Sequence, residues 1–184
     1  MPGMKRHIAL LRGINVGNAK RVAMADLRAL MEGLGFSGVR TLLNSGNAVF
    51  DAKAGTADVH AKRLRAAILE HAGVDCEVVV KTAADLAAAI AEHPLRRHAA
   101  DDSRLLVMFA QSASTLAELK TLEAGDWAPE AFAVGAHAAW LWCANGVIES
   151  RVSKAVVKVL KGRGTARNWA TVEKLQAMVV VAAE

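Results

Sequence analysis

The sequence has few of the residues that build redox, metal or covalently stabilised sites. Only two cysteines are present, Cys76 and Cys143, and each lies in a short apolar run far from the other. No C-x-x-C pair or Cys/His ligand spacing occurs, so we expect two buried free thiols rather than a disulfide or a metal site. Sequence signatures of phosphate-binding loops, serine hydrolases and zinc proteases are also absent. We therefore expect no metal and no cofactor, and the sequence identifies no catalytic residue.

Aromatic residues are scarce as well. The chain has no tyrosine, four phenylalanines and four tryptophans. RNA-binding domains of the RRM type stack bases on exposed aromatic side chains of their sheet, and only Phe50 lies in a corresponding predicted strand. Base stacking is therefore disfavoured, which leaves contacts with the phosphate backbone as the remaining way to bind a nucleic acid.

Secretion and membrane insertion are not indicated either. The N-terminal residues lead directly into a short apolar strand, without the longer apolar core and cleavage site of a signal peptide. The longest stretch free of charged side chains, residues 131–148, is interrupted by Gly135, His137, Asn145 and Gly146. We expect paired strands there, a cytoplasmic location and no membrane partner.

Charge is unevenly distributed along the chain, whose net charge is +5. Residues 4–40 carry seven basic and two acidic side chains, and residues 151–174 carry seven basic and one acidic. The middle, residues 41–150, carries nine basic and fourteen acidic side chains. If the basic segments meet in space they form a positive face suited to an anionic partner, and otherwise they are ordinary solvated helix surfaces.

Hydrophobic spacing in the first half alternates between strand and helix. Apolar runs bounded by turn residues are typical of strands, and apolar residues three and four apart are typical of helices. The segment NSGN at residues 44–47 predicts a hairpin turn. The predicted order is strand, helix, strand, strand, helix, strand, over residues 7–11, 24–34, 39–43, 48–51, 56–73 and 76–80.

The second half follows this order in part. The predicted strands cover residues 105–110, 131–134 and 138–143, and the predicted helices cover residues 112–122 and 152–160. Instead of a last strand, Gly162 and Gly164 predict a loop, followed by a helix that Asn168 caps. Residues 82–91 predict a connecting helix, and the polar stretch after it is expected to be a linker in which His93 and His98 face solvent.

This element order is that of the ferredoxin-like split βαβ fold. We therefore predict an α+β protein of two tandem ferredoxin-like, βαββαβ-type halves, with antiparallel sheets and helices on one face. The predicted halves are residues 1–81 and 104–184, joined by residues 82–103, and the second half carries an extra C-terminal helix.

Three short polar segments lie where predicted strands and helices begin or end. Glycines after the first strand let backbone N–H groups turn toward an anion, and a guanidinium or a helix N-terminus binds anions directly. Each segment also has a structural explanation, as a strain-relieving loop, a hairpin turn and a helix N-cap. The candidate ligand-binding residues are Arg12, Asn15, Ser45, Asn47, Arg167 and Asn168.

The segments LRGINVG, SGN and TARNW, at residues 11–17, 45–47 and 165–169, resemble the DUF1697 family of bacterial proteins without assigned function. The resemblance covers nearly the whole chain and implies tandem ferredoxin-like halves. Relatives often have a second glycine where this chain has Asn18. The loop therefore has one glycine fewer that would let backbone N–H groups turn toward an anion. Leu42-Leu43-Asn44 replaces a more usual Tyr-Ile-Gln, which removes an aromatic that a stacking site would use.

Three hypotheses for the function follow. The first is binding of a small anionic ligand, bearing phosphate or carboxylate, where the three polar segments meet. The second is binding of a nucleic acid backbone through the basic chain ends, and above all through one stripe of a predicted helix, which we expect to be exposed: Arg151, Lys154, Lys158 and Lys161. The third is a structural or interaction protein in which the polar segments hold the halves together. The sequence leaves the ligand, any reaction and the oligomeric state open.

Overall fold

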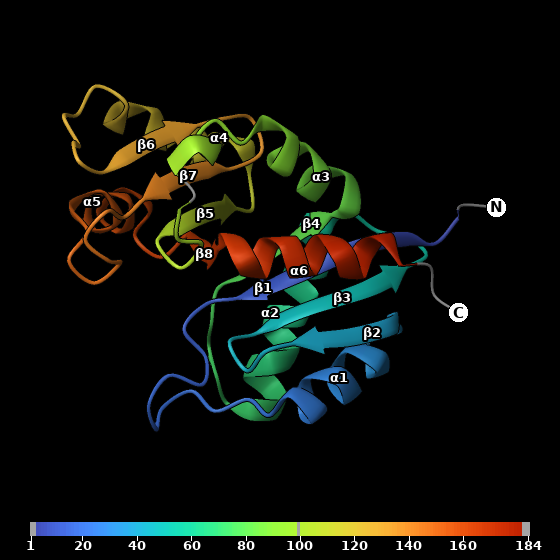
Figure 1. Cartoon of the computed structure of the whole chain (residues 1–184). Coiled ribbons are helices and arrows are strands. Elements are labelled where there is room, and N and C mark those ends of the chain that lie inside the picture. The colour runs from blue at the N-terminus through green and yellow to red at the C-terminus, as the bar shows by residue number, and fades with distance from the viewer. Residues whose placement is uncertain (1–2, 99, 182–184) are drawn as a thin grey trace. The chain divides into compact units, whose positions relative to one another are not determined.

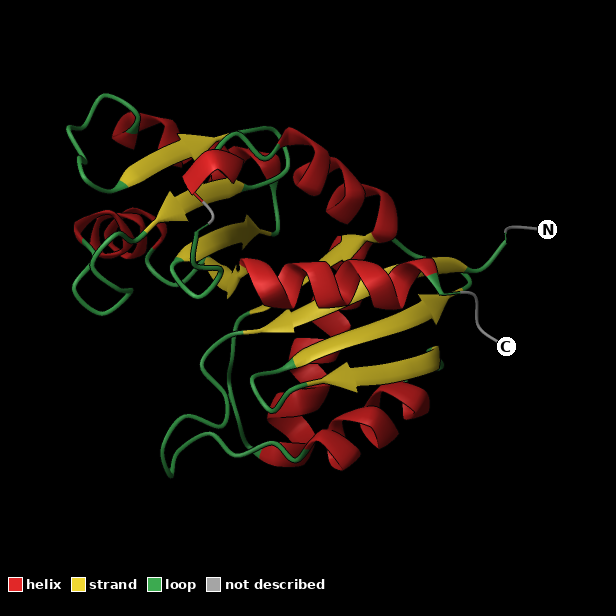
Figure 2. Cartoon of the chain, viewed as in Figure 1, coloured by secondary structure: helices red, strands yellow, loops and turns green. Residues whose placement is uncertain are grey.

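The computed structural model describes residues 3–98 and 100–181 and contains two four-stranded antiparallel sheets with helices packed against them (Figure 1, Figure 2). The chain divides into two compact units. The first unit holds residues up to Ala84 and those from Leu175 onward, and the second unit holds Asp85–Lys174. Each unit has the element order of a βαββαβ fold, which confirms the predicted α+β class.

The first unit is built on a sheet whose strand order is β2-β3-β1-β4. Its strands are β1 (Lys5–Leu11), β2 (Ser37–Leu42), β3 (Asn47–Ala52) and β4 (Val78–Thr82). The central strand β1 pairs antiparallel with both β3 and β4, and residues 8–11 are fully buried. Four consecutive buried apolar residues are expected of a strand that is covered on both faces.

One face of this sheet is covered by α1 (Met24–Gly33) and α2 (Ala57–Ala72) (Figure 1). The apolar stripes of the two helices supply Leu27, Leu64 and Ile68 to a core shared with alternate strand residues such as Leu11 and Phe50. Thr56 caps α2, since its side chain accepts a hydrogen bond from Val59 N, and Gly73 ends it in a left-handed conformation.

The opposite face of the sheet is met by the last turns of α6 (Trp169–Val180). Arg6 binds both carboxylate oxygens of Asp51, at 2.9 and 3.0 Å, and also donates to Val179 O at 3.2 Å. Arg40 donates to Met178 O. Two guanidinium groups therefore satisfy carbonyl groups at the C-terminal end of a helix, where cations are favoured.

The second unit has a sheet of strand order β6-β7-β5-β8. Its strands are β5 (Leu105–Ala110), β6 (Ala131–Val134), β7 (Ala139–Trp142) and β8 (Gly164–Asn168). The helical segments are α3 (Ala83–Glu92), η1 (Arg96–His98), α4 (Ala113–Ala117), η2 (Glu118–Leu122) and α5 (Arg151–Leu160). Residues of α4, η2 and α5 share a core with one face of this sheet.

Two element predictions were wrong in this unit. The loop predicted at Gly164 is strand β8, which pairs with β5 from Leu106↔Asn168 to Ala110↔Gly164. A Cβ at Gly164 would lie 2.9 Å from Phe109 O, so this glycine lets two backbones approach closely rather than marking a loop. The single helix predicted over residues 112–122 is a short α-helix followed by a 3-10 helix.

The uncharged stretch at residues 131–148 contains β6 and β7, which pair as predicted. None of the helices in residues 3–98 and 100–181 is long and apolar enough to span a membrane. Cys76 and Cys143 are free and buried, as expected, and burial raises the pKa of both thiols.

Candidate functional site

The first polar segment opens a loop between β1 and α1, residues 12–22, which we call the basic loop. Asn15 closes it. Its Nδ2 donates to Val22 O and to Asn44 O, both at 2.8 Å, and its Oδ1 accepts from Val22 N at 2.8 Å. Its backbone N–H donates to Lys20 O at 3.0 Å, and its φ of 54° is left-handed. Asn15 therefore joins the two ends of the loop and ties them to the β2–β3 turn.

That turn packs on the exit of β1 through Gly46. Its φ is 90°, and a Cβ there would lie 2.8 Å from Leu11 Cβ and 2.9 Å from Ile14 Cδ1. Leu11 N donates to Gly46 O at 2.8 Å. Only glycine meets both the conformational and the steric requirement at this position.

Ser45 and Asn47 complete the turn. Asn47 is fully buried, and its Nδ2 donates to Leu42 O at 2.9 Å and to Ser45 Oγ at 3.0 Å. Leu10 pairs with Asn47 in the β1–β3 register, as expected from antiparallel pairing of the first and third strands. The segments LRGINVG and SGN therefore come together, and three of the predicted ligand residues, Asn15, Ser45 and Asn47, hold loop and turn in place.

Arg12 has no such structural role. It is half-buried, and its backbone N–H donates to Glu77 O at 2.9 Å. Its guanidinium makes no hydrogen bond or ion pair with any residue of the described chain. Of the thirteen arginines in the sequence, the side chains of three are unpaired in this sense: Arg12, Arg21 and Arg97. Two of the three lie in the basic loop.

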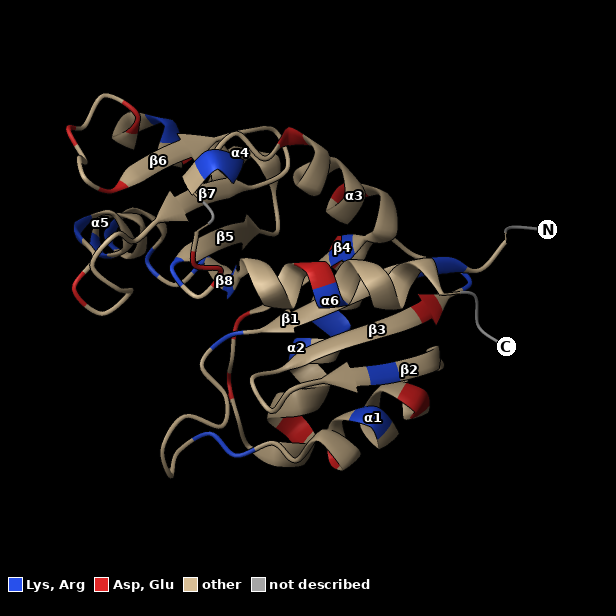
Figure 3. Ribbon diagram, viewed as in Figure 1, with Lys and Arg blue, Asp and Glu red and all other residues tan. Residues whose placement is uncertain are grey.

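The charge of the basic loop is not balanced from within, because residues 12–22 contain Arg12, Lys20 and Arg21 but no acidic residue (Figure 3). The acids in the segment before β4 are already paired: Arg65 binds Asp75 and Glu77, each at 2.8 Å. The hydrogen bond from Arg65 lowers the pKa of Asp75. Lys20 Nζ lies 3.4 Å from Asp75 O, a long contact with a carbonyl.

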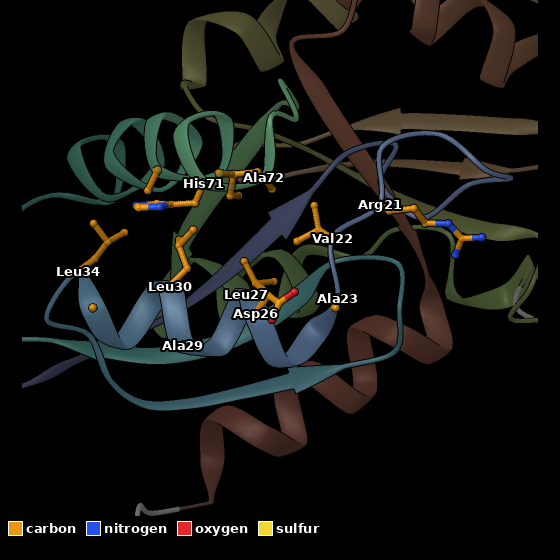
Figure 4. Close-up of a pocket in the computed structure, with 13 residues that line it drawn as sticks. Arg21, Val22, Ala23, Asp26, Leu27, Ala29, Leu30, Leu34, His71 and Ala72 are labelled. Carbon is orange, nitrogen blue, oxygen red and sulfur yellow. The ribbon is translucent and has the colours of Figure 1, made fainter.

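A groove between α1 and α2 begins where the basic loop ends, and we call it the α1–α2 groove (Figure 4). Its volume is about 580 Å³. The buried side chains of Val22, Leu27 and Ile68 belong to the core and line the groove, together with half-buried Leu30 and Leu34. Sequence reasoning predicted a helix over residues 24–34 and did not detect the groove. The sequence does contain a signal for the groove, because several of its lining residues are too small to fill the space between the helices: Ala23, Ala29, Ala72 and Gly33.

The third polar segment lies in the second unit. Arg167, predicted in a loop before a helix, is part of β8 and is buried. Its Nη1 donates to Thr165 Oγ1 at 2.6 Å and to Ala166 O at 2.8 Å, and burial lowers its pKa to about 10, so it stays charged at neutral pH. Asn168 accepts a hydrogen bond from Thr171 N at 2.9 Å, as expected of an N-cap. A share of Arg167 and Asn168 in a common ligand site stays a prediction.

The basic stripe of α5 is exposed at Arg151, Lys154, Lys158 and Lys161, as expected. Arg151 is anchored, because its Nε lies 3.7 Å from the buried carboxylate of Glu130, which also accepts from Arg151 N at 2.9 Å. The three lysine side chains make no hydrogen bond or ion pair with described residues. Binding of nucleic acid by this stripe stays a prediction.

His93 is buried, so the expectation that it faces solvent was wrong. Its ring stacks on Trp140, with centroids 6.0 Å apart, and tilts against Trp169 at 4.5 Å. Its Nδ1 accepts from Leu95 N at 3.3 Å, whereas Nε2 has no partner in the described part of the chain. Burial, helped by the charge of Arg96, lowers the pKa of His93 to about 4.

Residues 3–98 and 100–181 contain no group of three or more His, Cys, Asp or Glu side chains placed to hold a metal ion. The basic loop carries two guanidinium groups, Arg12 and Arg21, without a partner in the described chain, and the apolar α1–α2 groove begins where this loop ends.

The comparisons with known proteins agree with this fold. The chain belongs to the family described as "Protein of unknown function (DUF1697)", whose sequence profile matches residues 4–140. Its structure is similar to that of the conserved bacterial protein SP0830 from Streptococcus pneumoniae, with a TM-score of 0.80 and 24% sequence identity. The match covers 96% of this chain and 99% of the other. No curated protein matches the chain.

The first prediction concerns Gly46, for which Gly17 is the matched control. Both have positive φ, 90° and 60°, but a Cβ at Gly17 would meet nothing within 4 Å. Gly17→Ala should cost about 1 kcal/mol of unfolding free energy, from backbone strain alone. Gly46→Ala adds collisions with Leu11 and Ile14, so it should cost about 2–5 kcal/mol. Urea unfolding followed by circular dichroism measures both, and equal costs would show that the turn does not pack on β1.

The second prediction concerns His93. Its pKa is about 4 when folded, against an ordinary value of 6.5, so the unfolded chain binds more protons between these values. The stabilisation is complete above pH 6.5 and is lost as the pH falls toward 4, by about 3 kcal/mol in all. All four tryptophans lie in the second unit, so tryptophan fluorescence in urea reports on its unfolding.

His93→Phe keeps the stacking and removes the titration, so its unfolding free energy should fall less steeply between pH 6.5 and 4. His98→Phe, which replaces a half-buried histidine of the same segment, should retain the steep dependence that His93 provides. An unchanged pH dependence in His93→Phe would contradict the assignment.

Proposed function

We propose that the first unit binds a small anionic ligand, bearing phosphate or carboxylate, at the basic loop. The observation that carries the proposal is the pair of unpaired guanidinium groups, Arg12 and Arg21, on a loop without acidic residues. Guanidinium groups form two parallel hydrogen bonds with phosphate or carboxylate, and such charge-assisted bonds are the strong ones. Ten of the thirteen arginines have a side-chain hydrogen-bond or ion-pair partner in the described chain, and of the three without one, only Arg97 lies outside the basic loop.

The hydrogen bonds that close the basic loop support the proposal. The hydrogen bonds of Asn15 to Val22 and Asn44 are made within the protein, so they hold the loop before any ligand arrives. A pre-ordered loop avoids the entropic cost of ordering on binding. In this account Asn15, Ser45 and Asn47 are positioning residues, and the direct contacts with the anion come from Arg12 and its neighbours.

The chemistry of the loop favours binding over a reaction. Residues 12–22 contain no His, Asp, Glu or Cys, so the loop itself supplies no general base and no nucleophile. A bound phosphate or carboxylate would be neutralised and oriented by the cations, without a group placed to move a proton.

A second candidate is binding of a nucleic acid backbone by α5 of the second unit. The observation that favours it is the row of exposed, unpaired lysines Lys154, Lys158 and Lys161, opposite the buried apolar stripe of the same helix. Such contacts are independent of sequence and weaken steeply with salt. A row of solvated lysines is also usual on helices, so this candidate ranks second.

The third prediction is that pyrophosphate binds the protein and that Arg12→Ala weakens its binding at least about tenfold, because a hydrogen bond to a charged group is lost. Stability should change by less than about 0.5 kcal/mol, since the side chain of Arg12 has no partner within the described chain. Isothermal titration calorimetry at fixed ionic strength measures the affinity, and urea unfolding measures the stability.

Arg97→Ala is the matched control, since it removes an equally unpaired guanidinium and changes the net charge by the same amount. It should leave the affinity unchanged. Equal weakening in both variants would show a general effect of charge, and no binding by the wild-type protein would contradict the proposal. Tight binding of an oligonucleotide that Lys154→Ala with Lys158→Ala abolishes would favour the second candidate.

A further inference from the structure

The α1–α2 groove has the size and lining of a ligand site. Pockets for small molecules usually have about 300–1,000 Å³ and mostly apolar walls, and this groove has about 580 Å³. Its apolar side chains are all aliphatic, from valine, leucine, isoleucine and alanine. A groove without aromatic side chains offers no face for stacking a flat ring, so its shape suits a flexible aliphatic chain.

Three polar side chains lie at the groove, and two of them are explained by the helices that carry them. Asp26 lies in the first turn of α1, where an acid is favoured by the helix dipole. His71 lies in the last turn of α2, where a basic group is favoured. Arg21 precedes α1, is exposed, and makes no hydrogen bond or ion pair with described residues. No described carboxylate forms an ion pair with Arg21, although Asp26 lines the same groove.

The arrangement of these groups separates an apolar part from a charged part. Figure 4 shows Leu30 and His71 between the two helices, whereas Arg21 extends beyond Val22 at the end where the basic loop joins α1. A ligand that fills the groove would therefore have its apolar body between the helices and its charged end outside them, near Arg21. Because the charged end stays close to water, it loses little of its hydration on binding.

We propose that the α1–α2 groove binds an unbranched aliphatic carboxylate of medium chain length, with its chain between α1 and α2 and its carboxylate on Arg21. This inference rests on the proposed function, since the carboxylate is the anion that the basic loop attracts, and it adds the class of ligand. The apolar chain gives the affinity, and Arg21 distinguishes a carboxylate from a neutral alcohol of equal length.

The fourth prediction uses decanoate as the probe, below its micellar concentration, with decanol as the neutral analogue. Ala29→Trp places a large side chain in the groove and should weaken decanoate binding at least about tenfold, by steric exclusion. Ala25→Trp is the matched control, since Ala25 is an exposed alanine of the same helix that does not line the groove. It should leave the affinity unchanged.

Arg21→Gln should weaken decanoate about tenfold and leave decanol unaffected. Isothermal titration calorimetry on the full chain measures these affinities, and circular dichroism checks that each variant is folded. The inference is overturned if decanoate does not bind, if Ala29→Trp and Ala25→Trp bind alike, or if Arg21→Gln changes decanoate and decanol equally.

The two proposals fail in different ways. If pyrophosphate binding depends on Arg12 while decanoate does not bind, the basic loop is an anion site and the groove inference is wrong. If decanoate binds as described and pyrophosphate does not bind, the groove inference stands in its own right, with Arg21 as the cation that binds the carboxylate, and the proposed role of Arg12 is wrong.

Discussion

The first unit depends on the close packing of the β2–β3 turn against the exit of β1. Gly46 lies so near Leu11 and Ile14 that a single methyl group would collide with both. The turn therefore packs directly against the end of β1 and against Ile14 of the basic loop. The chain leaves β1 as a loop, and Asn15 closes that loop with hydrogen bonds to Val22 and Asn44.

The basic loop and the α1–α2 groove adjoin each other in the first unit. Arg21 is exposed and Arg12 is half-buried, and the hydrogen bonds of Asn15 to Val22 and Asn44 close the loop that carries them. Val22 and Ala23 connect the end of the loop to the start of α1, and α1 lies beside α2. Small residues at the facing positions of these helices leave the α1–α2 groove open. The cations and the apolar groove are therefore products of the same local arrangement.

Sequence reasoning predicted most of this unit because its local signals agree with its tertiary structure. The NSGN turn, the Thr56 cap and the glycine that ends α2 each specify one conformation. That the candidate ligand residues bind a ligand stays a prediction: Asn15 and Asn47 donate to backbone carbonyl groups, and Asn47 also donates to Ser45 Oγ. Which side-chain hydrogen-bond donors lack a partner depends on the folded geometry, and the residue types alone do not determine this.

Two features of the second unit were predicted wrongly from local sequence patterns. Strand β8 has glycine at its start and a buried arginine near its end, so it lacks an apolar alternation, and its pairing with β5 decides its structure. His93 follows a helix in a polar stretch, yet Trp140 and Trp169, distant in sequence, enclose it. Both features come from long-range contacts, which single-sequence patterns do not reveal. The family profile and the SP0830 structure identify the fold, and the proposed function rests on the geometry of the loop and groove.

The central claim is that the basic loop is held rigid by the protein itself, without a ligand. Hydrogen exchange measured by NMR on the ligand-free protein tests it most directly, because an amide bonded inside a stable structure exchanges only when that structure opens. The account predicts that the amide protons of Asn15 and Val22, bonded to Lys20 O and to Asn15 Oδ1, are protected to a degree similar to that of Leu11, bonded to Gly46 O. Free exchange at Asn15 and Val22 beside a protected Leu11 would contradict it, since the cations would then lie on a loop that a ligand has to order.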